Sequence, residues 1–252
     1  MLTTFLCFFR MRGKLMREIN VRRELDTLSD LGTRRRSGTS IRRANNRTPT
    51  SSTTKRCVDA TLAGVALVVL APMIVMVVAI LLVTQGRPIF HSHRRVGKNG
   101  VLFPCLKFRT MVKNGEEVLA QHLDANPSLR AEWNATRKLK DDPRVTQFGR
   151  LLRKNSVDEI PQLFNVIRGE MSLVGPRPIV TSEAELYGAH FADYIRVRPG
   201  LTGLWQVSGR SDTSYDTRIA LDVRYIAEQS LWGDVVIMAK TIPAVLSSRG
   251  SY

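Results

Sequence analysis

The longest apolar run in the chain lies between residues 58 and 83. It contains 26 residues, and Asp59 carries its only charge. A helix of this length and composition is long enough to cross a bilayer, so we expect it to insert into a membrane rather than to form a buried core helix. Pro72 lies near its middle, where the missing N–H and the bulky ring of proline predict a kink.

Basic residues flank this apolar run on both sides. Lys55 and Arg56 precede it, and a second basic cluster follows it: Arg87, Arg94, Arg95 and Lys98. A spanning helix would place one cluster on the outer face of the membrane, against the tendency of basic residues to stay inside. We therefore favour a re-entrant helix over residues 55–84 that returns both ends to the cytosol. A bent spanning helix is the alternative, because membrane helices tolerate proline.

After the apolar run, the alternation of apolar and polar positions predicts a β-hairpin over residues 89–110. Lys98-Asn99-Gly100 supplies the turn between its two apolar-rich strands. In the second strand Leu106 and Phe108 should share one face, and Lys107 and Arg109 the other.

Two further stretches have a helical pattern. Residues 114–138 form a polar helix with a few apolar positions on one side. Residues 233–246 have a broad apolar face that lies either in the membrane interface or against the core. We expect an α+β fold that is mostly helical, with a re-entrant membrane helix, interfacial helices and one cytosolic domain over residues 85–252.

The positive charge of the chain is concentrated near its beginning. The formal net charge is +16, and residues 1–56 contribute +10 of it, with fourteen Lys and Arg against four Asp and Glu. This stretch has too few apolar residues to offset the entropy that the chain would lose on ordering. We therefore expect residues 1–54 to be a disordered basic tail. Such a tail suits nucleic acid or an anionic membrane surface. The cysteines are too few and too far apart for a zinc site or a disulfide framework, and we expect reduced thiols: Cys7, Cys57 and Cys105.

Two adjacent carboxylates stand at a predicted helix start. Pro161 is tolerated in a first helical turn and Gly169 is a stop signal, so we expect a helix that begins near Asp158. Free N–H groups at a helix start favour the ionised forms of Asp158 and Glu159. An ionised carboxylate beside cations can act as a nucleophile that accepts a phosphoryl group. A plain helix cap is the alternative, because Ser156 and Glu159 also fit the S-x-x-E capping box.

Cations recur along the chain at intervals that local helix pairing does not explain. Several lie in rigid turns built from proline and glycine, and an arginine held in a fixed frame binds phosphate oxygens with two parallel hydrogen bonds. Each of them alone could be a solvated surface charge. Together with the carboxylate pair and the membrane segment, they predict a diphosphate site formed by Lys107, Arg109, Arg153, Arg177, Arg198 and Arg210.

Four motifs occur in order along the chain: KFRTM at 107–111, DEIPQL at 158–163, GPRP at 175–178 and RPGLTGLWQV at 198–207. Together they resemble the bacterial sugar transferase family, the monotopic polyprenyl-phosphate sugar-1-phosphate transferases. The resemblance covers residues 55–252, and within the family it is closest to short enzymes that initiate exopolysaccharide synthesis.

The resemblance implies a re-entrant membrane helix and a covalent mechanism. Asp158 would attack the sugar-linked phosphate of a UDP-sugar and release UMP. The hexose-1-phosphate, of galactose or glucose, would then pass to undecaprenyl phosphate. Glu159 would help to hold Mg²⁺, together with Asp234 at another acidic position of the family. Arg153 and Arg177 match family positions near the substrate phosphates.

The expected partners are a UDP-sugar, a polyprenyl phosphate lipid and the bacterial inner membrane at its cytosolic face, with a homodimer left open. The body of the chain has no recognisable nucleic-acid motif, so we expect no nucleic acid. A membrane-tethered nucleic-acid-binding or scaffold protein remains the alternative function.

Overall fold

The computed structural model describes residues 52–136, 139, 141–208 and 214–246. The predicted tail lies outside the described residues, except for positions 52–54. These three positions begin the first described helix.

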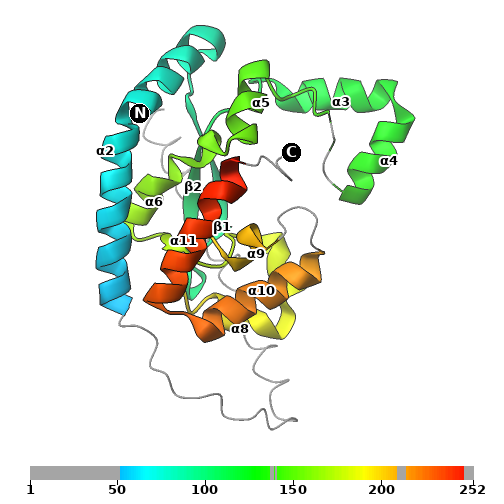
Figure 1. Cartoon of the computed structure of the whole chain (residues 1–252). Helices are drawn as coiled ribbons and strands as arrows, with labels where there is room; N and C mark the ends of the chain where they lie inside the picture. Colours follow the sequence, from blue (N-terminus) through cyan, green and yellow to red (C-terminus); the bar gives the residue numbers. More distant parts are fainter. Residues whose placement is uncertain (1–51, 137–138, 140, 209–213, 247–252) are drawn as a thin grey trace, which may run out of the picture.

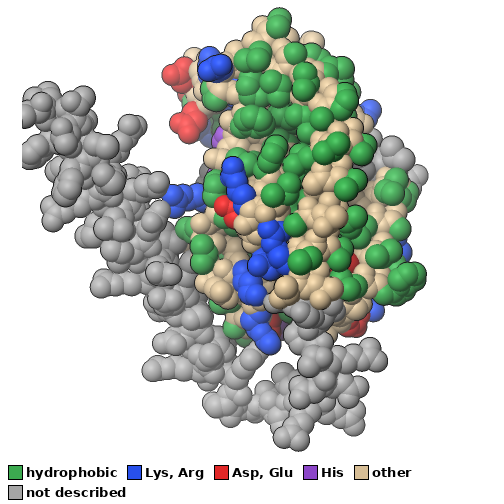
Figure 2. Space-filling view, turned by 90° about the vertical axis from the view of Figure 1, so that its left-hand side faces the viewer, with side chains coloured by type: hydrophobic (Ala, Val, Ile, Leu, Met, Phe, Trp, Pro, Cys, Tyr) green, Lys and Arg blue, Asp and Glu red, His purple; other side chains and the backbone are tan. Residues whose placement is uncertain are grey.

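The apolar run forms one long helix, α2, Ser52–Gln85, which continues through Pro72. It lies along one side of the molecule (Figure 1) and is long and apolar enough to cross a membrane. A narrow stripe packs inward, with Ala63, Val77 and Leu81 buried. Most of the helix surface is exposed, and the exposed residues include Val68, Val69 and Val83. Figure 2 views this side directly: hydrophobic side chains cover much of the face, and Lys and Arg gather in a band across its lower half.

The predicted hairpin is confirmed. β1, Phe90–Val96, pairs with β2, Leu102–Phe108, in an antiparallel register that places Phe90 opposite Phe108. The 3₁₀ turn η2, Lys98–Gly100, joins them, with positive φ angles of 57° at Asn99 and 74° at Gly100. The Lys-Asn-Gly signal marks the turn because asparagine and glycine tolerate this region best.

The predicted polar helix is interrupted. It divides into α3, Gly115–Ala125, and α4, Pro127–Thr136, on either side of Asn126. Pro127 disfavours a helical conformation for the residue before it, which accounts for the break. The next helix is α5, Gln147–Lys154. Thr146 caps its N-terminus, because the threonine hydroxyl accepts a hydrogen bond from the Gly149 N–H at 2.9 Å.

Two short strands pair in a parallel sheet beside the α-helix that follows α5. The 3₁₀ turn η3, Val157–Glu159, leads into α6, Gln162–Arg168, and then into β3, Ser172–Val174. β3 pairs in parallel with β4, Gly200–Thr202. Gly200 is needed here because a Cβ atom on it would lie 2.1 Å from the Gly175 nitrogen. The RPG turn is therefore packed directly against the GPRP turn.

Short helices complete the domain around these strands. They are η4, Thr181–Glu183; α7, Ala184–Tyr187; η5, Gly188–His190; α8, Phe191–Tyr194; α9, Leu204–Val207; α10, Tyr215–Glu228; and α11, Leu231–Leu246. α11 has two apolar faces. Ile237 and Met238 pack in the core, whereas Trp232, Val235 and Ile242 are exposed. The mostly helical fold class is confirmed by this element order.

Candidate active site

The carboxylate pair lies on a tight turn between two helices. α5 ends at Lys154, and Ser156 then adopts a left-handed conformation with φ at 55°. This reversal turns η3 back toward β2 and buries the Asp158 side chain. The Asp158–Glu159 pair therefore sits where a strand, a turn and a helix start meet.

Lys107 on β2 joins the two carboxylates. Its Nζ lies 2.6 Å from Oε1 of Glu159 and 3.6 Å from Oδ2 of Asp158. The three residues come from elements separated by about fifty positions in the sequence, and the structure brings them into one cluster. The contact with Glu159 is a charge-assisted hydrogen bond, which is among the stronger kinds in proteins, whereas the contact with Asp158 is an ion pair.

Burial is the largest influence on the Asp158 carboxyl, and it raises its pKa above the usual value. The charge of Glu159 also raises this pKa, whereas Lys107 and Arg153 lower it. Desolvation would lower the pKa of Lys107, but Glu159 and Asp158 together raise it above its usual value, so Lys107 stays cationic. Lys107 and Arg153 are therefore what favours an ionised, nucleophilic Asp158 in a partly desolvated site.

Arg153 approaches the pair from α5. Its Nε donates to the Thr110 hydroxyl at 2.9 Å, which fixes the guanidinium beside the end of the hairpin. Burial lowers the pKa of Arg153, and the charge of Asp158 raises it. The charges of Arg153 and Asp158 thus favour each other's ionised forms.

The helix-cap interpretation of the pair is wrong. Ser156 makes no side-chain capping hydrogen bond, and the Glu159 carboxylate contacts Lys107 instead of the turn. The predicted helix end is confirmed, because Gly169 closes α6 with a φ of 82°. The carboxylates thus face a cation contributed by another element.

The comparisons with known proteins show the family of the chain. Residues 50–248 match the family described as Bacterial sugar transferase, which includes all of the residues that build the cluster. The chain belongs to this family. Membership disfavours the alternative of a nucleic-acid-binding or scaffold protein.

Several curated relatives are similar to this sugar transferase. The Exopolysaccharide production protein ExoY of Sinorhizobium fredii is 54% identical over 204 residues, which cover 81% of the chain and 90% of that relative. The Undecaprenyl-phosphate galactose phosphotransferase of Salmonella typhimurium is 53% identical over 168 residues, which cover 67% of the chain and 35% of that longer relative. The UDP-glucose:undecaprenyl-phosphate glucose-1-phosphate transferase of Caulobacter vibrioides is 36% identical, with 79% of the chain and 72% of that relative covered.

Arg109 of the sugar transferase points to the end of α2. Its Nη2 donates to the backbone carbonyls of Gln85 at 2.7 Å and Gly86 at 2.9 Å, and its Nε lies 3.3 Å from Oε1 of Gln85. The side chain is buried, and its Nη1 has no hydrogen-bond partner among the described residues. Most of its donors therefore hold the C-terminal end of the membrane helix.

The remaining described residues of the predicted phosphate site, Arg177 and Arg198, contact residues outside the carboxylate cluster. Arg177 lies over the Trp205 ring at 5.7 Å, and its backbone N–H donates to Asp222 at 3.3 Å. Arg198 donates from Nε to the Gly169 carbonyl at 2.7 Å. Arg210 lies outside the described residues. Among the described cations of this set, Lys107 contacts both carboxylates, and the charge of Arg153 lowers the pKa of Asp158.

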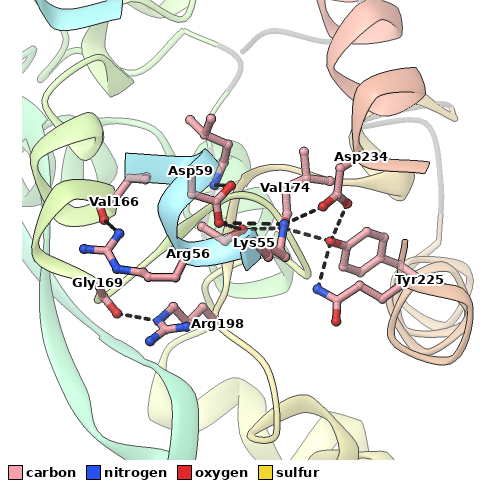
Figure 3. A network of polar contacts seen from close by, with 12 residues as sticks. Lys55, Arg56, Asp59, Val166, Gly169, Val174, Arg198, Tyr225 and Asp234 are labelled. Atoms are coloured by element: carbon pink, nitrogen blue, oxygen red, sulfur yellow. Dashed lines mark hydrogen bonds and ion pairs between the residues drawn. The ribbon is translucent and has the colours of Figure 1, made fainter. Parts of the chain in front are cut away.

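Asp234 belongs to a second polar network, at the start of α2 (Figure 3). Its Oδ2 lies 2.5 Å from Nζ of Lys55, and its Oδ1 accepts from the Tyr225 hydroxyl at 2.8 Å. Both carboxylate oxygens thus have partners away from Glu159. Among the described residues there is no group of three or more His, Cys, Asp or Glu that could hold a metal.

Sequence reasoning missed Asn165, which positions the cluster from behind. Its side-chain nitrogen donates to the Pro104 carbonyl at 2.8 Å and to Glu170, and its oxygen accepts from the Leu106 N–H at 3.0 Å. Asn165 is fully buried and ties α6 to the strand that carries Lys107. An amide side chain within the apolar Leu-Phe-Asn-Val-Ile sequence was the available signal.

Proposed function

We propose that this sugar transferase moves a hexose-1-phosphate, of galactose or glucose, from a UDP-sugar to undecaprenyl phosphate, with release of UMP. The reaction would be the first step of exopolysaccharide assembly. The observation that carries the proposal is the contact of Lys107 with two adjacent carboxylates, the buried Asp158 and the partly buried Glu159. Family membership and the names of the relatives support this substrate class.

In the proposed mechanism, an oxygen of the Asp158 carboxylate attacks the phosphorus that bears the sugar. The new bond forms as the bond from that phosphorus to the bridging oxygen breaks, and UMP leaves with the bond electrons. An oxygen of the lipid phosphate then attacks the same phosphorus, which forms the sugar diphospholipid and regenerates the carboxylate. Lys107 and Arg153 offset the repulsion between Asp158 and the anionic substrates.

Mg²⁺ is part of the proposal, and Glu159 is the residue that would help to hold it. The fit rests on the donors present: Glu159 is only partly buried and stands next to the nucleophile. Magnesium commonly takes one or two carboxylates, with waters and substrate phosphates as its other ligands. When bound, it would neutralise charge on the diphosphate. Asp234, whose oxygens have other partners, is left out of this ligand set.

We further propose that α2 is re-entrant and that the enzyme works at the cytosolic face of the inner membrane. The contacts at both ends of α2 support this topology. Lys55 at the start contacts Asp234 of α11, and Gln85 at the end contacts Arg109 and Thr146. Because both ends are bonded to one body, they belong on one side of the membrane. The exposed Trp232 and Ile242 of α11 would lie at the interface.

Purified enzyme, undecaprenyl phosphate and a panel of UDP-sugars test the function. UMP release and formation of a lipid-linked product are expected with UDP-galactose or UDP-glucose. Turnover should continue only when lipid phosphate is present. A protein that releases no UMP with any UDP-sugar would contradict the proposal.

Cysteine accessibility tests the topology. Single cysteines at Thr53 and Lys98 should both resist a membrane-impermeant reagent added to intact cells, and both should react after lysis. The expectation follows from the tethers at the two ends of α2. Labelling of either position from outside would exclude a re-entrant helix.

A further inference from the structure

The basic pair at the start of α2 makes specific contacts within the protein. Nζ of Lys55 lies between two carboxylates, 2.5 Å from Oδ2 of Asp234 and 3.7 Å from Oδ2 of Asp59. The side chain of Lys55 is only 12% exposed, and those of Asp234 and Asp59 are 6% and 8% exposed. This cation is therefore almost entirely used inside the fold and has little surface left for lipid headgroups.

Arg56 covers the C-terminal end of α6. Its Nη1 donates to the Val166 carbonyl at 2.5 Å, and its Nη2 donates to the Ile167 carbonyl. Arg198 donates to the carbonyl of Gly169, the residue that closes this helix. The last carbonyls of a helix have no partner within it and carry partial negative charge, so two guanidinium groups at this end are favourable.

The two carboxylates beside Lys55 extend the network into the sheet and the last helices (Figure 3). Asp59 accepts from the Ser172 hydroxyl at 2.7 Å and from the Leu173 N–H at 3.3 Å, which fixes β3. The hydroxyl of Tyr225 on α10 contacts both Oδ1 of Asp234 and the Val174 carbonyl. One short stretch of α2 is thus bonded to α6, β3 and α11.

This network is connected to the catalytic segment through α6. That helix begins at Gln162, just after Glu159, and its C-terminal end is held by Arg56. Between these ends, Leu163 and Val166 pack with Ala63 of α2 in one buried cluster. A shift of the start of α2 would therefore move α6 and the carboxylates that precede it.

We propose that Lys55 and Arg56 are positioning residues that dock the membrane helix onto the catalytic domain and thereby fix where Asp158 stands relative to the membrane. The bonding partners, rather than the positive charge as such, are what this role requires. The proposal rests on the proposed function for its activity readout, but the docking itself can be measured without any substrate.

Charge relocation separates the docking role from a simple basic flank. Thr54 is exposed and precedes Lys55, so the double variant Lys55→Met/Thr54→Lys keeps the net charge of the flank and removes the buried ion pair. The matched control is Thr54→Lys alone. We expect the double variant to insert into membranes normally, to melt roughly 5 °C lower, and to turn over at least about tenfold more slowly with little change in KM for the UDP-sugar. Activity and melting like those of the control would overturn the proposal.

A double-mutant cycle gives a test that does not depend on activity. Lys55→Met, Asp234→Asn and the combined variant are compared by thermal unfolding in detergent. Docking predicts strong non-additivity, because each single change takes from a buried charged group its nearest group of opposite charge. Additive shifts in Tm would refute the contact. Intact coupling in an enzyme that releases no UMP would instead retain the docking and reject the proposed function.

Discussion

An Asp158→Asn variant is expected to lose both UMP release and lipid product by a factor on the order of 10³ or more. The amide cannot accept a phosphoryl group, although it has nearly the same shape as the carboxylate. The melting temperature should change little or rise, because burial already disfavours the charge at this position. Product formation and thermal unfolding are measured on the same preparation.

Asp124→Asn is the matched control, since Asp124 is exposed on α3 and pairs only with a nearby arginine. A second measurement follows the covalent step directly. Wild-type enzyme incubated with labelled UDP-sugar and no lipid should retain label on Asp158, whereas the variant should retain none. A folded Asp158→Asn enzyme with near wild-type turnover would end the covalent mechanism.

Asn165→Leu is expected to have the largest effect on stability. Leucine fills a similar volume, but it leaves the Leu106 N–H and the Pro104 carbonyl without the partners they now have. Buried groups that lose their hydrogen bonds cost about 1–3 kcal/mol each, so the free energy of unfolding should fall by about 2–6 kcal/mol. Chemical denaturation in detergent measures the change.

The control for this substitution is Asn155→Leu, at an exposed asparagine that follows α5 and donates from its side chain to the Leu151 carbonyl of that helix. Its unfolding free energy should be close to that of the wild type. Because Asn165 ties β2 to α6, turnover of the folded fraction of Asn165→Leu should also fall as Lys107 moves relative to Glu159. An Asn165→Leu protein as stable as the wild type would show that the hydrogen bonds across this contact contribute little.

Local elements were largely predictable because their signals are local. The turn at Asn99-Gly100 and the end of α6 at Gly169 follow from residues that tolerate positive φ. The length of α2 follows from its apolar run. The break at Asn126 could have been predicted from Pro127, but the helical pattern on both sides concealed it.

The site was predictable only in part, because sequence spacing does not say which elements lie side by side. The carboxylate pair was identified from its own helix start, but its pairing with Lys107 depends on how η3 returns to β2. Arginine has the same donors for a phosphate as for a carbonyl. Arg109 and Arg198 were therefore predicted as phosphate ligands because they are arginines, but in the structure both contact backbone carbonyls. Periodicity likewise could not reveal that Asp234 contacts Lys55.

The inward stripe of α2 has a practical consequence for anyone who wants a water-soluble version of the enzyme. Ala63, Val77 and Leu81 close two of the buried clusters of the domain, against residues of β2, α5 and α6. Removal of residues 1–85 would take one side away from these clusters and expose apolar surface to water. Such surface would promote aggregation. Solubility is better sought on the outward face: polar replacements at Val65, Val69 and Met76, all exposed, leave the wall in place.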